Sequence, residues 1–484
     1  MTARTLVWYR GNDLRVSDHR PLSDAAQSGS VVPVFVLDPH FFAVNPPRRG
    51  AHRMQFLIES LVELNQNLAR LGSKLIVVSG KTVEVIPRLA RQWNVDRVVA
   101  QRVTEPLARE WEERIAQLLS VPLVLLDGET LLPPTTLRTG AGTPYLVFTP
   151  FARAFAKIAD EVGSPLLAPR KLPPLPSALS VSESLAIPSL AELGISANRH
   201  LHSGGETAAK RRLQSFLRTT LADYAEGRDR MDLPGTSRLS ADLSLGTISV
   251  RTVWDAVCRC RAAPRAVRSL DAFRNELIWR EFAHSTLWDR PELLEAPFRK
   301  DFLDFPWRKD DGDWDAWVQG TTGYPVVDAA ARQLLTEGWV HNRARMVAAS
   351  FLTKHLMIDF RLGEKHYLEQ LVDADCASNN MGWQWSAGCG CDAQPYFRIF
   401  NPLVQGERFD PDGQYVRRWV PELAKLPAKY IHRPAAAPGA VRLAASVVMG
   451  KTYPEPRVDH VAARSRFLQI AESHINKARA NADS

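Results

Sequence analysis

Short apolar runs alternate with amphipathic segments through the first third of the chain. The apolar runs occupy residues 5–10, 31–38, 74–80, 97–103 and 122–128. Continuous apolar runs of this length are typical of parallel strands, which are covered on both faces. The pattern therefore predicts a parallel β-sheet in this part of the chain.

The segments between these runs carry a helical period. Residues 53–72 place apolar side chains on one helical stripe, namely Met54, Leu57, Ile58, Leu61, Leu64 and Leu68. Residues 83–93 and 106–119 are also predicted to be helical. A strand, a helix and a second strand form the crossover unit of a doubly wound α/β domain. The G-x-G-x-x-G fingerprint of dinucleotide-binding domains does not follow the first strand.

The rest of the chain changes character twice. Residues 131–200 are rich in Pro and Ser and poor in periodicity, which is typical of a connector between domains. Beyond His200, helical patterns cover residues 206–227, 249–260, 270–288, 324–339, 342–357 and 364–372. We therefore predict a doubly wound parallel-sheet α/β domain at residues 1–130, a connector at 131–200, an all-helical domain at 201–474 and a tail at 475–484.

Length and composition agree with two domains. The chain has 484 residues, of which 45% are hydrophobic and 24% charged, as in globular proteins. No apolar run approaches the length of a membrane span. Arg10, Asp13 and Arg15 follow the first apolar run closely, so this run cannot serve as the core of a signal peptide, and we expect a cytoplasmic protein.

Charge and cysteine content narrow the function only slightly. The net charge of +8 suits a polyanionic partner but is also common among soluble proteins without one. The five cysteines are expected to be reduced thiols, because we expect no export. The C-x-C pairs Cys258/Cys260 and Cys389/Cys391 lack the spacing of zinc sites, so we expect no metal site.

The string GTSRLS, residues 235–240, places a glycine and three hydroxyl groups ahead of a predicted helical stretch. Free backbone N–H groups at such a helix end attract phosphate. Ser and Thr also favour a plain N-cap whatever the function. On this string alone, the two interpretations are equally supported.

Glu276, Trp279 and Arg280 share one face of a predicted helix, because they follow the spacing i, i+3 and i+4. A carboxylate, an indole and a guanidinium group on one face can serve a binding site. A surface ion pair beside a packed aromatic ring is the commoner explanation.

A second helical face combines Trp339, Asn342, Arg345 and Met346, a mixture that is unusual for a core. A buried Asn and a buried Arg would need partners. Residues 371–385 supply candidate partners and two indoles: Asp373, Asp375, Asn379, Trp383 and Trp385.

Seven strings in the chain resemble the successive signatures of the DNA photolyase and cryptochrome family, in order and at the expected separations. They are WYRGNDLR, GTSRLS, NELIWREF, TGYPVVDAAARQL, GWVHNRARM, ASNNMGWQW and PYFRIFNPLVQGERFDPDGQYVRRWVPEL. The resemblance runs from about residue 5 to about residue 460 and is closest to the class I cyclobutane pyrimidine dimer photolyases. It implies an N-terminal antenna domain and a C-terminal helical domain that binds FAD in a U-shaped conformation.

The resemblance implies which residues hold FAD. They are Tyr224, Thr236, Ser237, Arg238, Leu239, Ser240, Phe273, Glu276, Arg280, Trp339, Asn342, Arg345, Asp373, Asp375 and Asn379. Arg345 paired with Asp373 would stabilise an anionic reduced flavin through fixed charges in a dry site. Asn379 would donate a hydrogen bond to that anion without releasing a proton, because amides do not titrate in this range.

The resemblance also implies a pocket for a pyrimidine dimer and a surface for DNA. The residues implied to act in the pocket are Glu276, Trp279, Asn342, Met346, Asn379 and Trp385. Indoles and a thioether offer apolar walls, while Glu276 and Asn342 can bind the edges of the dimer. The implied DNA-binding residues are Arg228, Glu276, Trp279, Asn342, Arg343, Trp385, Arg398 and Gln405.

The activity that the resemblance implies is light-dependent repair of DNA. Blue light excites the reduced flavin, one electron passes to the dimer, the cyclobutane ring splits and the electron returns, so that the cofactor does the chemistry. Extrusion of the dimer from the duplex is a known property of photolyases as a class. We expect the protein to be a monomer.

The chain departs from the family in its electron relay. The family passes electrons to oxidised FAD along three tryptophans. Trp383 and Trp307 match the inner and outer members, whereas Phe360 occupies the middle position. Phenylalanine is much harder to oxidise than tryptophan, so we predict slow photoreduction of oxidised flavin and normal repair once the flavin is reduced.

A second departure concerns the antenna chromophore. Where folate-binding relatives carry an Asn and Glu pair and a later Lys, this chain has Leu107, Ala108 and Leu294. If a second chromophore is bound, a deazaflavin or flavin mononucleotide is therefore favoured over folate. Met381 occupies a position that is glycine in many relatives, and nothing in the sequence explains it.

The main alternative is a cryptochrome-type blue-light photoreceptor without repair activity. Asn379, Asn342 and Met346 are the photolyase-like choices at their positions, and no long tail follows the helical domain. A single His341 ahead of Asn342 argues against a six-four repair enzyme, in which a pair of histidines is usual. A subunit of an electron-transfer flavoprotein is a more remote alternative that leaves the helical domain unexplained.

Overall fold

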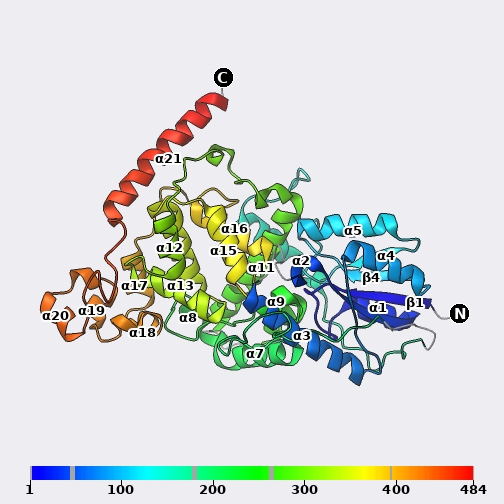
Figure 1. Cartoon of the computed structure of the whole chain (residues 1–484). Coiled ribbons are helices and arrows are strands. Elements are labelled where there is room, and N and C mark those ends of the chain that lie inside the picture. Colours follow the sequence, from blue (N-terminus) through cyan, green and yellow to red (C-terminus); the bar gives the residue numbers. More distant parts are fainter. Residues whose placement is uncertain (1–2, 44–49, 177–182, 261–265, 393–394, 483–484) are drawn as a thin grey trace. The chain divides into compact units, whose positions relative to one another are not determined.

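The computed structural model describes residues 3–43, 50–176, 183–260, 266–392 and 395–482 (Figure 1). The chain forms two compact units. Unit 1 comprises Met1–Ala222, Ser237–Pro291 and Val372–Ala377, and unit 2 comprises Asp223–Thr236, Glu292–Leu371 and Ser378–Ser484. Unit 1 therefore contains several helices from the region that the sequence predicts as the helical domain.

Unit 1 is built on a five-stranded parallel sheet in the order β3-β2-β1-β4-β5. The strands are β1 (Ala3–Tyr9), β2 (Gly29–Leu37), β3 (Ile76–Ser79), β4 (Arg97–Gln101) and β5 (Leu123–Leu126). In register, Val7 of β1 lies opposite Pro33 on one side and Val99 on the other. The predicted parallel sheet is confirmed, and each strand falls within or next to its predicted run.

Helices follow the strands as the crossover pattern requires. They are α1 (Arg20–Ser28), α2 (Pro39–Phe42), α3 (Ala51–Arg70), α4 (Thr82–Gln92) and α5 (Pro106–Leu118). The predicted helices correspond to α3, α4 and α5. Val85, Ile86 and Leu89 of α4 are buried in one apolar cluster with the strand residues Leu6 and Val34.

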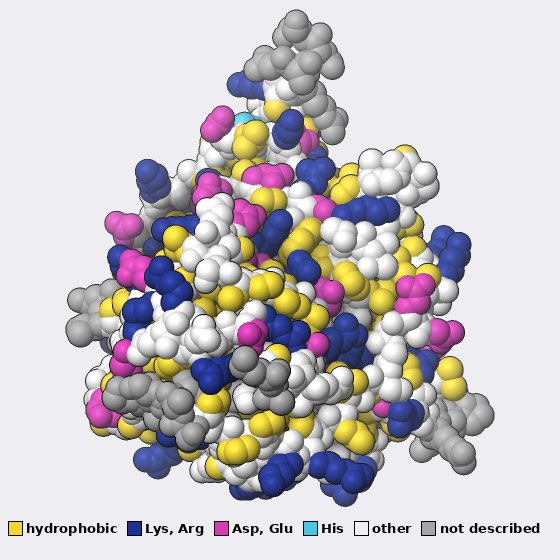
Figure 2. Space-filling model, turned by 90° about the vertical axis from the view of Figure 1, so that its right-hand side faces the viewer, with side chains coloured by type: hydrophobic (Ala, Val, Ile, Leu, Met, Phe, Trp, Pro, Cys, Tyr) yellow, Lys and Arg dark blue, Asp and Glu magenta, His cyan; other side chains and the backbone are white. Residues whose placement is uncertain are grey.

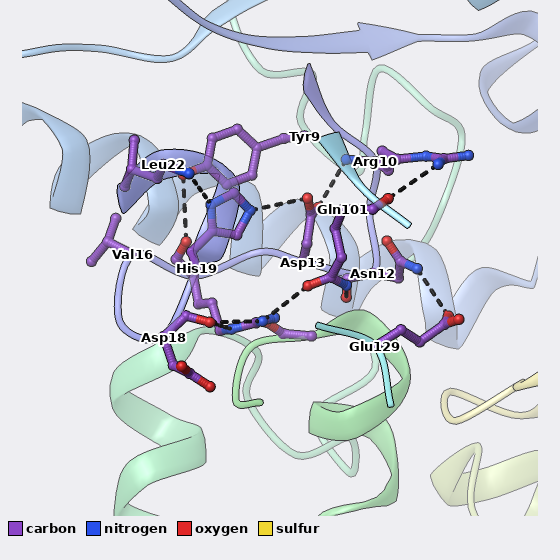
Figure 3. Close-up of polar contacts among 12 residues, drawn as sticks. Tyr9, Arg10, Asn12, Asp13, Val16, Asp18, His19, Leu22, Gln101 and Glu129 are labelled. Carbon is purple, nitrogen blue, oxygen red and sulfur yellow. Dashed lines mark hydrogen bonds and ion pairs between the residues drawn. The ribbon is translucent and has the colours of Figure 1, made fainter. Parts of the chain in front are cut away.

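His19 begins helix α1 from a buried polar cluster at the carboxyl end of β1 (Figure 3). Its Nδ1 accepts a hydrogen bond from the backbone N–H of Leu22 at 3.1 Å, and its Nε2 lies 3.1 Å from Asp13. Burial lowers the pKa of His19, although the hydrogen bond with Asp13 opposes this effect. The lowered pKa favours a neutral ring. The imidazole also stacks on Tyr9, with centroids 4.6 Å apart.

The remaining helices of unit 1 are α6 (Phe148–Lys157), α7 (Glu206–Thr219), α9 (Ser240–Leu245), α10 (Val250–Cys258) and α11 (Val267–Asp289), with the 3₁₀ turn η1 (Ala159–Val162). Helix α6 lies in the segment predicted as a connector poor in periodicity. Its apolar side chains Phe151 and Phe155 are spaced i, i+4 and are buried, which is the helical pattern that the Pro-rich composition obscured.

Unit 2 is mainly helical in its described part. Its helices are α8 (Tyr224–Gly227), α12 (Asp311–Gln319), α13 (Pro325–Glu337), α14 (Asn342–Ser350), a π-helical turn η6 (Phe351–His355), α15 (Phe360–Gln370), most of α16 (Cys376–Ala387), α17 (Pro402–Phe409), α18 (Gln414–Trp419), α19 (Ala428–Ile431), α20 (Gly439–Ala444) and α21 (His460–Ala482). Short 3₁₀ turns are η2 (Leu221–Asp223), η4 (Pro291–Leu294), η5 (Lys300–Phe302), η7 (Pro421–Leu423) and η8 (Pro434–Ala436).

Helix α13 shows how local sequence sets these boundaries. Pro325 stands at its first turn, where a missing N–H costs nothing, and Gly338 ends it with φ of 60°. Within the described residues, none of the helices combines the length and the apolar character needed to cross a membrane.

Candidate functional site

Helix α11 carries the predicted face of Glu276, Trp279 and Arg280, all of them half-buried. The indole of Trp279 stacks on Phe148 of α6, with ring centroids 3.6 Å apart and planes 6° apart. The Arg280 guanidinium donates a hydrogen bond to the backbone carbonyl of Glu129 at 2.7 Å. The indole is therefore fixed on one face by a neighbouring ring, and the guanidinium is tied to the segment after β5.

A buried histidine on the same helix was not singled out from the sequence. His284 Nδ1 lies 2.6 Å from the Thr104 hydroxyl, and its Nε2 lies 3.3 Å from the Asp375 carboxylate. Glu129 lies 3.7 Å from Nδ1. Burial and the neighbouring Arg280 both favour the neutral ring, but the carboxylates outweigh them and raise the pKa of His284 to about 9. The ring is therefore a cation at neutral pH.

This cation orders one of the predicted cofactor-binding carboxylates. Asp375 is half-buried, and the imidazolium beside it favours its ionised form. The sequence held a signal for this cluster, since His284 follows Arg280 by four residues and shares its face of the helix. The same helix places the buried ring of Phe273 against Phe216, with centroids 4.6 Å apart.

The predicted phosphate-binding residues are divided between the two units: Tyr224 and Thr236 belong to unit 2, and Ser237, Arg238, Leu239 and Ser240 belong to unit 1. The hydroxyl-bearing residues of the GTSRLS string are half-buried. Helix α9 begins at Ser240, and no side-chain hydrogen bond caps it at Leu239. The Ser237 hydroxyl accepts the backbone N–H of Leu239 at 3.4 Å, and the phosphate-binding interpretation stays a prediction.

The backbone of this segment is closely packed within unit 2. A Cβ at Gly235 would clash with the carbonyl oxygen of Gly227, so glycine is required there. Arg228 lies over the ring of Tyr224, with its Cζ 5.5 Å from the centroid. Hydroxyl, phenol and guanidinium donors held in a tight turn suit the phosphate groups of FAD chemically.

The predicted stripe of unit 2 lies on and next to helix α14. His341 begins this helix by accepting the Arg343 N–H at 3.1 Å. Asn342 is exposed, contrary to the expectation of a buried amide, and its Nδ2 lies 3.8 Å from the Met346 sulfur. The Arg345 Nε donates to the carbonyl of Val340 at 2.8 Å.

Trp339, Met346 and Trp385 are each half-buried, so their rings and thioether are partly accessible. The predicted pair of Arg345 and Asp373 joins residues of different units and stays a prediction. Asp373 is buried, with 7% of its surface exposed.

Helix α16 positions Asn379 through a hydrogen bond from its Nδ2 to the carbonyl oxygen of Glu364 at 3.0 Å. An amide nitrogen has two N–H donors, so the second donor is still available to a ligand. The next residue, Asn380, is buried and donates to the carbonyl of Leu293 at 2.7 Å. These bonds fix the start of α16 against its neighbours.

The relay residues are brought together only in part. Trp307 and Phe360 lie edge to face with centroids 6.5 Å apart. The buried indole of Trp383 packs over Gly363, where a Cβ would clash with it. Its nearest aromatic partners are Tyr367 at 5.0 Å and Trp317 at 6.0 Å.

A second pair of tryptophans beside Trp383 was missed from the sequence. Trp317 is buried and stacks on the half-buried Trp314 with centroids 5.6 Å apart. These indoles lie three residues apart on α12, a spacing that could have drawn attention to them.

The predicted DNA-binding residues differ in their exposure and in the contacts that their side chains already make. Arg343 pairs with Asp229 at 2.8 Å and lies over Phe409, so its guanidinium is already engaged. Arg398 is exposed, and Gln405 on α17 is half-buried. On the face drawn in Figure 2, Lys and Arg side chains are interspersed with acidic and hydrophobic ones.

At the carboxyl end of the sheet, between β1 and β4, the Arg10 side chain is held by several contacts. Open α/β sheets bind ligands at such a switch point. Here the Arg10 guanidinium donates to the carbonyls of Gln101 at 3.1 Å and Ala108 at 3.2 Å, and it pairs with Glu112. Ala108 thus contributes its backbone alone, and Leu107 beside it offers no polar group to a folate.

Comparisons with known proteins agree with this architecture. Residues 5–175 match the family model described as "DNA photolyase", and residues 273–473 match the "FAD binding domain of DNA photolyase". A protein of Agrobacterium fabrum named deoxyribodipyrimidine photo-lyase is 42% identical, with 96% of this chain and 97% of that protein covered.

Two solved structures have similar folds. A bacterial class III photolyase from Agrobacterium tumefaciens superposes with a TM-score of 0.90 at 40% identity, covering 99% of this chain and 98% of that one. A cryptochrome from Synechocystis sp. PCC6803 gives a TM-score of 0.88 at 32% identity, covering 97% and 99%.

The parallel sheet, the helical unit and the FAD-binding match define a flavoprotein of the photolyase and cryptochrome architecture. The chain belongs to the DNA photolyase family. The expected closeness to class I is not confirmed, because a structure at 40% identity is a class III photolyase.

Proposed function

We propose that this chain is a deoxyribodipyrimidine photo-lyase that repairs cyclobutane pyrimidine dimers in DNA under blue light. The observation that carries the proposal is the face of α11, where Glu276 adjoins an indole held flat by Phe148. Curated relatives between 34% and 42% identical over nearly the whole chain carry that enzyme name. Bound reduced FAD supplies the light-driven electron.

The donor chemistry of the predicted residues fits FAD. Tyr224, Thr236, Ser237, Arg238 and Ser240 would bind its phosphates through hydroxyl and guanidinium groups. Asn379 has an amide hydrogen left to donate to the reduced ring, and it cannot supply a proton readily. Of the two carboxylates, Asp373 would pair with Arg345, whereas Asp375 lies 3.3 Å from the His284 ring.

Each unit contributes groups suited to a pyrimidine dimer. In unit 1, Trp279 would stack on the bases and Glu276 would hydrogen-bond a carbonyl of the dimer. In unit 2, Asn342, Met346 and Trp385 expose an amide, a thioether and an indole to the same kind of ligand. Arg228, Arg343, Arg398 and Gln405 would hold the phosphates of the damaged strand.

Further parts of this proposal concern binding partners. The protein would act on DNA as a monomer. A second chromophore, if bound, would be a deazaflavin or flavin mononucleotide, because Leu107, Ala108 and Leu294 replace polar residues of folate-binding relatives. Mass analysis of the chromophores extracted from purified protein tests this assignment.

A repair assay separates the enzyme from a photoreceptor of the same fold. Reduced protein would be mixed with an oligonucleotide that contains one thymine dimer, in the dark and under blue light. We expect loss of the dimer in the light alone. Photoreduction without dimer loss would favour the cryptochrome-type alternative, and failure of the purified protein to bind FAD would contradict both functions.

A further inference from the structure

Lys354 is a fully buried lysine in an unusual turn. It lies in the π-helical turn η6 that follows α14, and none of its surface is exposed. Turns of this kind are rare and are frequently found at functional sites. The assigned FAD, dimer and DNA groups do not include it.

The ammonium group makes a hydrogen bond that joins distant parts of unit 2. Its Nζ donates to the backbone carbonyl oxygen of Arg398 at 2.9 Å. The partner is a neutral carbonyl, so this bond brings no opposite charge to offset burial. Burial lowers the pKa of Lys354 to about 7, and the neighbouring thiol of Cys389 only partly opposes that effect.

A buried ammonium group destabilises the fold relative to an apolar side chain of the same length. Stability therefore does not explain why a lysine occupies this fully buried position. The bond that it makes indicates a positional role.

The backbone that accepts this hydrogen bond belongs to a turn with two exposed side chains, Phe397 and Arg398. The Arg398 N–H donates to the Pro395 carbonyl at 2.9 Å, which closes a tight turn. Phe397 is 56% exposed, and Arg398 is exposed beside it. Lys354 thus fastens the backbone of the turn from the inside while the guanidinium group points outward.

We infer that Lys354 is a positioning residue for DNA binding: its buried ammonium group anchors the 395–398 turn so that Arg398 meets a phosphate of the damaged strand. This inference rests on the proposed function, which assigns Arg398 to DNA. A guanidinium group on a fixed turn loses less conformational freedom on binding, and that gain is reflected in affinity.

The test compares Lys354→Met, which keeps the length and removes the charge, with Lys365→Met, which removes a charge at an exposed position of α15. Affinity of the intact flavin-loaded protein for a thymine-dimer oligonucleotide would be measured in the dark over a series of salt concentrations. We expect Lys354→Met to bind about tenfold more weakly and to lower the salt slope by about one, as loss of one phosphate contact does. Lys365→Met should behave as the wild type.

A double-mutant cycle decides whether the lysine acts through Arg398. We expect Arg398→Ala and the double variant to bind equally weakly, because the anchor has no further effect once the guanidinium is gone. Additive losses would overturn the inference. Hydrogen exchange of the amides at 396–401 should be faster in Lys354→Met without any DNA, and unchanged exchange would also overturn it.

Stability provides the remaining control. Flavin absorbance should be unchanged in Lys354→Met and its melting temperature should not fall, because a buried charge is replaced by an apolar chain. A variant that loses its flavin or does not fold would identify a purely structural lysine. Wild-type protein that does not prefer dimer-containing DNA would contradict the proposed function itself, whatever the exchange data show about the anchor.

Discussion

The phenyl ring of Phe148 lies parallel to the indole of Trp279, with centroids 3.6 Å apart. Phe282 meets both rings edge on, at 6.1 Å and 5.9 Å. One face of the indole is therefore covered by Phe148, and Phe282 further limits the part of the ring that a ligand can reach. Phe148 was absent from the predicted site because its segment carried no helical period strong enough to draw attention.

This stack predicts that Phe148→Ala weakens binding of dimer-containing DNA. An aromatic pair contributes about 1 kcal/mol, so affinity should fall about fivefold. Trp279→Ala should cost more, about tenfold or greater, because it removes the ring on which the bases stack. Phe148→Tyr serves as the matched control and should bind normally. Equal binding by all three variants would show that the pocket lies elsewhere.

Glu276→Ala is expected to lower the yield of repair per absorbed photon. The carboxyl group would hydrogen-bond the dimer as negative charge develops there, and one such bond corresponds to about a tenfold change. The measurement is dimer loss under calibrated blue light at saturating protein. Dark affinity reported alongside it separates a chemical effect from a binding effect, and an unchanged yield would remove Glu276 from the reaction.

Phe360 predicts slow photoreduction of the oxidised flavin, with repair by chemically reduced enzyme unaffected. Phe360→Trp should accelerate photoreduction under blue light with an external thiol as electron donor, because it fills the gap between Trp383 and Trp307. Transient absorption at tryptophan-radical wavelengths is the readout. Fast photoreduction in the wild type that is lost in Trp317→Phe would instead place the route through the indoles of α12.

His284 predicts a pH dependence of stability. Its pKa is raised to about 9 by Asp375 and Glu129 against the effects of burial and Arg280. The stabilisation is complete below pH 6.5, where the unfolded histidine is also protonated, and is lost as the pH rises through 9. The free energy of unfolding of the wild type minus that of His284→Gln should therefore fall by about 3 kcal/mol between these pH values. A constant difference would mean that the ring is neutral.

The lowered pKa of Lys354 predicts that stability changes with pH in the opposite direction. Its pKa is lowered to about 7, so the charged form is the costly one and the cost falls as the pH rises above 7. The groups that face it include Cys389, and His355 adjoins it in the same turn. Lys354→Met should raise the free energy of unfolding more at pH 6 than at pH 9.5. Urea unfolding at the two pH values checks this, and a larger gain at high pH would contradict it.

The sequence predicts the sheet well because parallel strands are covered on both faces and leave continuous apolar runs. It also predicts that Glu276, Trp279 and Arg280 share a face, since helical spacing alone decides that. The accessibility of Asn342 could not be predicted, because it depends on where helix α14 begins, and that boundary is set by a side-chain cap from His341.

The other features that the sequence did not predict depend on contacts between segments that are distant in the chain. The charge on His284 depends on Glu129 and Asp375, which are far apart in sequence. The role of Lys354 depends on a carbonyl 44 residues away. Neither pairing leaves a periodic trace in the chain.

Helix α11 shares its buried charges with the segment that follows the sheet. The carboxylate of Glu281 accepts the N–H groups of Leu131 and Leu132, and His284 reaches Thr104 just beyond β4. A fragment that began near residue 201 would leave the Glu281 carboxyl group without these two N–H donors and His284 without Thr104 and Glu129. We therefore expect the helical part to be destabilised when it is excised, and a chimera that exchanges residues 104–132 together with α11 to keep these contacts.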